Sequence, residues 1–182
     1  MRFVLVLLTA LIWAYYFFPV QVSGTVYIVT NSATVRTLPL TEIKVYPLKQ
    51  FRAAFYLKQA FVSEHCIGAK DEASAAKALL EKGPVAREDY EQSVVCSPRN
   101  LISSIELEPK EILITDQLGN FTFSLSRLND VVLVAMAERQ LPLEKERYLW
   151  LVPVSAHRGF TVAVELNNLN QVVSSDIRDI AL

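Results

Sequence analysis

Short runs of alternating apolar and polar residues, separated by turn residues, constrain the fold of this chain more than any other feature. The run 121–125 alternates strictly, and it follows a segment, 116–120, that contains Asp, Gly and Asn. The runs 24–30 and 42–46 alternate in the same way. Such alternation indicates strands with one face in a core. The side chains expected to face inward are Val26, Ile28, Ile43 and Val45.

Several further runs resemble strands. Residues 131–137 form a nearly continuous apolar run, as expected for a strand covered on both sides, and the remaining candidates are 102–107, 111–115, 148–154 and 160–166. About seven short strands at regular spacing are typical of a sandwich. We therefore predict a mainly β fold, a seven-or-so-stranded antiparallel β-sandwich with a helical-pair insertion and an N-terminal hydrophobic helix.

The insertion covers about 49–93, where the apolar spacing changes to that of helices. One helix is expected over 51–65 and a second over 69–82, with Gly83 and Pro84 as a stop signal. Residues 85–92 have no clear pattern. The first helix has an apolar side formed by Phe51, Ala54, Phe55 and Val62, and Leu57 and Phe61 widen this apolar face. In the second helix the side chains expected to face inward are Ala73, Ala76, Leu79 and Leu80.

The N-terminus has the sequence pattern of a targeting segment. Residues 3–18 contain no charge and follow Arg2, which is the plan of a secretory leader. The run is short for a membrane span unless it continues through Val20 and Val22, and Val22-Ser23-Gly24 offers small residues for cleavage. A buried N-terminal core helix is the alternative. We predict a signal peptide or membrane anchor over 1–22, a sandwich domain over 23–173, a short tail over 174–182 and an extracytoplasmic location, with cleavage left open.

Two cysteines, Cys66 and Cys96, lie beyond this segment. In an oxidising compartment an even pair forms a disulfide, which would stabilise the chain by roughly 3–4 kcal/mol in the chain-entropy model. The alternative is two separate buried thiols that pack as small apolar groups. We predict the bridge as the better interpretation.

Several segments together resemble a known domain family. They are Thr115-Asp116-x-x-Gly119-Asn120-Phe121-x-Phe123, then 131–139, then Glu146-x-Tyr148-x-Trp150 through Val154, and finally Leu166-Asn167-Asn168-x-Asn170. In this order they look like a carboxypeptidase regulatory-like domain, a transthyretin-like (prealbumin-like) β-sandwich. The resemblance implies a structural or binding appendage rather than an enzyme. The helical stretch is not part of the minimal domain and is interpreted as an insertion.

The sequence contains no recognisable cluster of catalytic or metal-binding side chains. A zinc hydrolase needs grouped histidines and acids, but the chain has two histidines, His65 and His157, and no H-x-x-E. A Cys/His metal site and a calcium site at Asp116 are weaker interpretations than a disulfide and an Asx turn. Tyr148 and Trp150 share a strand face and form either core or an exposed platform. We predict no catalytic, cofactor or metal residues.

These observations favour a non-enzymatic exported or envelope module for binding or assembly. The net charge of −1 without a basic run argues against nucleic acid. The alternatives are a small carrier with a cleft between helices and sheet and, third, an unrecognised hydrolase. Expected partners are an unknown protein or small ligand, and the membrane through the N-terminal segment. The partner residues are unknown, with the exposed face of 51–64 as the first guess.

Overall fold

The computed structural model describes Tyr15 and residues 18–30, 32–141, 145–156, 160–173 and 176–182. The chain forms two compact units, one from residues 1–49 and 109–171 and the other from 50–108 and 172–182. The first unit holds the strands. They are β1 (Val20–Val29), β2 (Val35–Thr37), β3 (Glu42–Pro47), β4 (Glu111–Ile114), β5 (Asn120–Leu125), β6 (Val131–Gln140), β7 (Lys145–Val154) and β8 (Thr161–Leu166).

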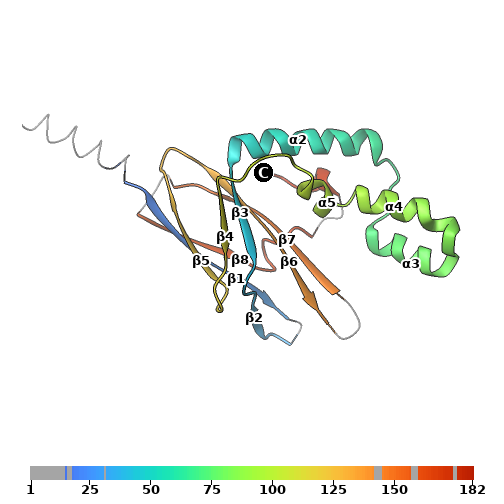
Figure 1. The fold of residues 1–182 in the computed structure, drawn as a ribbon, viewed down its shortest axis with the longest axis horizontal. Helices are drawn as coiled ribbons and strands as arrows, with labels where there is room; N and C mark the ends of the chain where they lie inside the picture. Colours follow the sequence, from blue (N-terminus) through green and yellow to red (C-terminus); the bar gives the residue numbers. More distant parts are fainter. Residues whose placement is uncertain (1–14, 16–17, 31, 142–144, 157–159, 174–175) are drawn as a thin grey trace, which may run out of the picture. The chain divides into compact units, whose positions relative to one another are not determined.

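The strands form two sheets, which confirms a mainly β fold (Figure 1). In one sheet, β1 pairs with β2, β5 and β8, and the other sheet has the order β4-β3-β6-β7. All pairs are antiparallel except β1 and β8, which run parallel. The wholly antiparallel sandwich that we predicted is therefore wrong at this pair. Alternation determines which face a strand buries but carries no information on the direction of its neighbour.

The apolar core lies between the two sheets. Val26, Ile28, Ile43 and Val45 are buried, as their alternation predicts. Trp150 is fully buried in the same core and Tyr148 is nearly so. Of the two alternatives for these side chains, the structure therefore shows core and not an exposed platform. Both sheets contribute to this core through every second residue of a strand. Other large buried contributors include Ile28, Ile43, Phe121, Phe123, Leu125, Leu133 and Leu166.

Two glycines allow close backbone packing between β1 and its neighbours. A Cβ on Gly24 would lie 2.3 Å from a ring carbon of Phe121 and 2.4 Å from the carbonyl oxygen of Val164. Gly119 has φ +79° in the turn before β5, and a Cβ there would lie 2.6 Å from the Val26 carbonyl oxygen. Glycine fits both places because it has no Cβ, and it also tolerates positive φ.

The turn before β5 is the expected Asx turn. The Asp116 carboxylate accepts hydrogen bonds from the backbone N–H groups of Leu118 and Asn120, both at 2.8 Å. These bonds, that from Asn120 first, hold the pKa of Asp116 below its usual value because they stabilise the charged form. The hairpin is therefore organised by one side chain that the sequence identifies.

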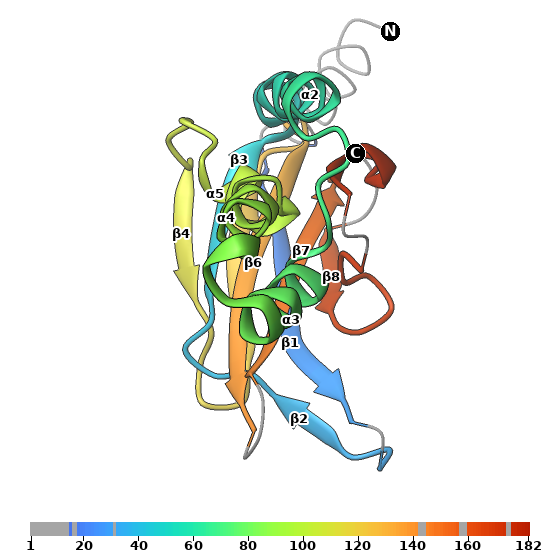
Figure 2. The same ribbon diagram turned by 90° about the vertical axis from the view of Figure 1, so that its right-hand side faces the viewer.

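The second unit holds nearly all of the helical segments. These are α2 (Leu48–His65), α3 (Glu72–Lys82), the 3-10 helix η1 (Gly83–Ala86), α4 (Arg87–Val95), α5 (Pro98–Ser103) and the 3-10 helix η2 (Ile177–Asp179). Asp71 caps α3 by accepting from the Ser74 N–H, and Ser97 caps α5 by accepting from the Asn100 N–H. Figure 2 shows α3 and α4 side by side. Cys66 and Cys96 form a disulfide, as predicted.

The helical region differs from the prediction in three places. It contains four α-helices rather than a pair, because the ambiguous residues 85–92 lie mostly in α4 and the strand expected at 102–107 begins inside α5. Pro98 at the first helical position and the Ser97 cap start that helix, and Leu101 and Ile102 are buried. The inward face of α3 is also different. Ala75 is its buried residue, whereas Leu80 is 88% exposed.

The two chain ends are only partly described. The N-terminal helix predicted within 1–22 falls mostly outside the described residues, and β1 already begins at Val20. Within the ranges given above, none of the helices combines the length and apolar character that a membrane span requires. In the tail, Asp176 caps η2, and Gln59 donates hydrogen bonds to the carbonyl oxygens of Ile177 and Ile180.

Candidate functional site

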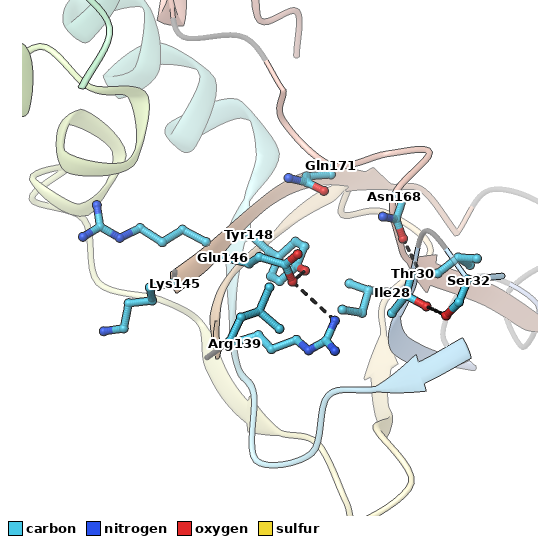
Figure 3. Close-up of a pocket in the computed structure, with 12 residues that line it drawn as sticks. Ile28, Thr30, Ser32, Arg139, Lys145, Glu146, Tyr148, Asn168 and Gln171 are labelled. Atoms are coloured by element: carbon cyan, nitrogen blue, oxygen red, sulfur yellow. Dashed lines mark hydrogen bonds and ion pairs between the residues drawn. The ribbon is translucent and has the colours of Figure 1, made fainter. Parts of the chain in front are cut away.

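An open groove of about 650 Å³ lies at one end of the two sheets, where β1 ends and the β6–β7 ribbon extends past the core (Figure 3). We call it the end groove. Residues from four places along the chain line it, so it is a product of the tertiary fold. They are Ile28, Val29, Thr30, Ser32, Arg139, Leu141, Lys145, Glu146, Arg147, Tyr148, Asn168 and Gln171.

A polar network of three side chains forms one wall of the end groove. Arg139 of β6 and Glu146 of β7 are directly opposite in the strand register, and their side chains meet at 3.4 Å. Tyr148 lies two residues after Glu146 on the same face and donates its hydroxyl hydrogen to the same carboxylate. Because all three positions continue the core-facing side of the ribbon, the network stands where the apolar core ends (Figure 3).

The protonation of Tyr148 follows from this environment. Burial of its ring, together with the hydrogen bond to the Glu146 carboxylate, raises the pKa of Tyr148 to about 12. Its ring stacks on Trp150 with centroids 5.7 Å apart. At neutral pH Tyr148 is therefore a neutral phenol that donates to Glu146, and its ring is fixed by the core beneath it.

The opposite wall is a loop of asparagines, 167–170, held by its own side chains. Asn168 accepts from the backbone N–H of Val29 at 2.6 Å, which ties the loop to β1. Asn167 accepts from the backbone N–H of Leu169, and Asn170 accepts from that of Asn167. The indole N–H of Trp150 donates to the Asn167 carbonyl oxygen at 2.9 Å. These bonds fix the loop before any ligand arrives, which lowers the entropic cost of binding.

The charges of the ribbon separate onto two faces. Arg139 and Glu146 are half-buried and face the end groove. On the other face, Glu138 pairs with Lys145 and Arg147 at the surface. Figure 3 shows Lys145 pointing away from Arg139 and Glu146. The interior of the groove thus presents one cation and one anion, already paired, rather than a net charge.

The groups that face the end groove can donate and accept hydrogen bonds in the same place. The hydroxyls of Thr30 and Ser32 lie 2.9 Å apart, and the side-chain amides of Asn168 and Gln171 stand across from the guanidinium and carboxylate. Hydroxyls and amides do both, a guanidinium only donates and a carboxylate only accepts. This mixture suits ligand hydroxyl groups, which also donate and accept.

Tyr148 and Asn168 are singled out from the sequence and line the end groove, but the cysteines and His65 lie elsewhere. Cys66 and Cys96 are joined in the helical unit. His65 lies on α2, where its ring stacks on Phe61, and His157 falls outside the described residues. Among the residues that the structure describes, no three histidine, cysteine or carboxylate side chains group as metal ligands. The cleft between helices and sheet that a carrier would need stays a prediction.

Sequence reasoning missed Arg139 and Glu146. Charged segments of this kind are usually solvated, but the structure half-buries these two side chains. The signal that could have found them is the alternation of the strands. Arg139 shares the parity of the buried Ala135, and Glu146 shares that of Tyr148 and Trp150. Extending both patterns would have placed a guanidinium and a carboxylate on the core-facing side of the ribbon.

No protein-family model and no curated protein matches this chain. The carboxypeptidase regulatory-like family therefore stays a prediction, while the two-sheet fold that it implies is present. Among solved structures, the chain is similar to the crystal structure of a "putative carbohydrate binding protein" from Pseudomonas aeruginosa. The identity is 19%, the match covers 86% of this chain and 94% of that one, and the TM-score is 0.41. A likeness at this level assigns neither family nor function.

Proposed function

We propose that this protein is a non-enzymatic extracytoplasmic binding module whose end groove takes a small, neutral, hydroxyl-rich ligand such as a carbohydrate. The observation that carries this proposal is the preordered mixture of donors and acceptors around the Arg139–Glu146 pair. The asparagine loop and the stacked Tyr148 and Trp150 hold these groups in place without a ligand. A rigid polar site of this kind supports recognition of ligand shape and hydroxyl pattern.

A neutral ligand fits the end groove better than an anion. An anion would have to displace Glu146 from Arg139 or accept its repulsion at close range, whereas a hydroxyl can bridge the two side chains. Lys145 and Arg147 do not change this balance, because both pair with Glu138 on the other face of the ribbon. Tyr148 stays protonated, so it adds a neutral surface rather than a charge.

The test is binding of a defined panel of probes. We would titrate the protein with neutral mono- and disaccharides, and in parallel with uronic acids and sugar phosphates, and follow backbone amide shifts by NMR. We expect shifts confined to 28–32, 139–148 and 168–171 with neutral sugars, and loss of these shifts in Glu146→Ala. The matched control is Glu138→Ala, which removes a carboxylate from the outer face of the same ribbon.

Three outcomes would contradict the proposal. They are shifts outside the end groove, shifts with the acidic sugars alone, or equal effects of the two substitutions. Catalytic turnover of any sugar in the panel would contradict the non-enzymatic part of it.

Two observations bear on the location of the module and on the fate of its N-terminal segment. The Cys66–Cys96 disulfide suits an oxidising compartment. Val20 and Val22 are fully buried in the core and belong to β1, so cleavage at Val22-Ser23-Gly24 would remove core side chains together with part of a strand. We therefore propose that no cleavage occurs there and that the hydrophobic segment preceding β1 is retained as a membrane anchor.

The intact mass of the native protein from fractionated cells tests both the location and the retention of the N-terminal segment. We expect a chain that keeps residues 1–22, in the membrane fraction, with no thiol that reacts before reduction. A mass that lacks residues 1–22, or free thiols at Cys66 and Cys96, would contradict it. This result is independent of the sugar titration, so the proposed location and the proposed ligand can be refuted separately.

A further inference from the structure

Helix α2 carries two apolar stripes, and one of them is buried. Phe51, Phe55 and Val62 are buried. On the other side of the helix, five apolar residues with the spacing of a single helical face are exposed, and we call them the outer stripe. They are Ala53, Tyr56, Leu57, Ala60 and Phe61. Leu57 is 72% exposed and Tyr56 is 53% exposed.

Exposed apolar residues are common singly, but an ordered stripe of this kind is typical of a helix that packs against another surface. Small residues at positions 53 and 60 allow a second helix to approach closely, with Leu57 between them. The outer stripe therefore has the side chains of a helix–helix contact.

The charges at the ends of the outer stripe identify the partner. Lys49 lies on the same helix face at its N-terminal end, and Glu64 lies on that face at its C-terminal end, and both are exposed. Lys49 and Glu64 are equally far from the point between Tyr56 and Leu57, and so are Ala53 and Ala60. A two-fold axis through that point places Lys49 against Glu64 of the second copy, and Ala53 against its Ala60.

We propose that α2 mediates an antiparallel self-association of this protein, with the outer stripes of two copies in contact and a Lys49–Glu64 ion pair at each end. A two-fold contact must be complementary to itself, and this helix face has that property in its end charges and in its two alanines. The opposite charges at the two ends also disfavour the parallel arrangement, which would bring like charges together. One helix pair is a small interface, so confinement of both copies to a membrane would favour it.

Zero-length carbodiimide crosslinking tests this arrangement directly, because it joins an amine to a carboxylate in contact. Within one copy, Lys49 and Glu64 are 15 positions apart on a continuous helix, or about 22 Å, which is far too long for such a crosslink. We would treat the full chain in detergent micelles and identify the linked peptides by mass spectrometry. We expect a covalent dimer with a Lys49–Glu64 crosslink.

Five variants make the result specific. Leu57→Asp should lower the yield of this crosslink about tenfold or more, because it buries a carboxylate in an apolar contact. Leu80→Asp on α3, at a residue more exposed than Leu57, is the matched control and should change nothing. Lys49→Glu and Glu64→Lys should each abolish the crosslink between positions 49 and 64, and the double exchange Lys49→Glu/Glu64→Lys should restore it.

The position of the crosslink, rather than the mass of the complex, decides the outcome. A dimer linked elsewhere, a monomer at every concentration, or failure of the double exchange to restore the crosslink would overturn the proposal. Binding of the outer stripe to a lipid surface or to an unrelated protein would appear as one of these results, because neither depends on exchange of the two charges. If Leu57→Asp fails to fold by circular dichroism, the charge exchange carries the test alone.

Discussion

The sheets and the helices of this chain bury their apolar side chains to very different extents. Between the sheets, Trp150, Leu133 and Leu125 are fully enclosed, together with side chains from nearly every strand. The helices bury Phe51 and Phe55 but leave Leu57 and Leu80 largely exposed. The sandwich is therefore held together by its core, whereas the helical unit, with fewer enclosed side chains, depends more on its disulfide.

This difference follows from the shapes of the elements. Two sheets face to face enclose every second side chain of each strand, so a short strand contributes fully to a core. Short helices such as α5 enclose a side chain only when another element covers it, and α3 has a single buried residue. A covalent bridge compensates for a small core, as it does in small secreted domains.

The largest effect should come from the sandwich core. Trp150→Ala removes a fully buried ring that stacks on Tyr148 and donates to the Asn167 carbonyl oxygen. We expect the free energy of unfolding to fall by about 3–5 kcal/mol, measured by urea denaturation followed by circular dichroism. Leu128→Ala, at an exposed site, is the control and should stay within about 0.5 kcal/mol. Similar losses for both variants would refute a core centred on Trp150.

The second effect should be confined to the helices. Replacing both cysteines, Cys66→Ser/Cys96→Ser, opens a loop closed across 30 residues, which costs about 3–4 kcal/mol in the chain-entropy model. By hydrogen exchange and mass spectrometry, we expect faster exchange in α3 and α4 and unchanged protection in β3, β6 and β7. Equal loss of protection in the strands would remove the distinction between the two regions.

A third substitution tests the close packing inside the sheets. Gly24→Ala places a Cβ within 2.4 Å of the Val164 carbonyl oxygen and closer still to the Phe121 ring. Such overpacking costs about 1–3 kcal/mol of the free energy of unfolding. Ser23→Ala, the adjacent and exposed residue of β1, is the matched control for urea denaturation. If Gly24→Ala proved as stable as the control, β1 would not approach its neighbours as closely as the structure has it.

The smallest effect concerns the end groove. Tyr148→Phe removes one hydrogen bond to Glu146 and should lower the free energy of unfolding by about 1 kcal/mol. Because the pKa of Tyr148 is raised to about 12, the folded state keeps the proton where the unfolded state loses it. The stabilisation is therefore complete below about pH 10, the ordinary value for tyrosine, and is lost as the pH rises through 12.

Urea denaturation of the native chain and of Tyr148→Phe at pH 8, 10 and 11.5 checks this dependence. The native chain should lose stability relative to the variant above pH 10. Tyr56→Phe, on the exposed face of α2, is the control. A difference between Tyr148→Phe and the native chain that did not change with pH would mean that the pKa of Tyr148 is not raised in the folded protein.

Local patterns in the sequence predicted a good part of this molecule. Alternation identified Val26, Ile28, Ile43 and Val45 as core residues, and the chemistry of Asp116 identified the Asx turn. The paired Cys66 and Cys96 predicted the bridge. These predictions succeed because strand faces and tight turns are determined within a few residues of the chain. Two cysteines in an oxidising compartment also have few alternatives.

What only the tertiary structure decided depends on contacts between distant segments. The parallel pairing of β1 with β8 joins segments about 140 residues apart, and no local pattern encodes its direction. The inward face of α3 depends on which neighbours cover it, so its spacing wrongly placed Leu80 inward and missed Ala75. The end groove combines β1, β6, β7 and the asparagine loop. From the sequence alone, charged residues on a short ribbon are expected to be solvated. Arg139 and Glu146 are half-buried only because the folded chain brings the opposite sheet close to them.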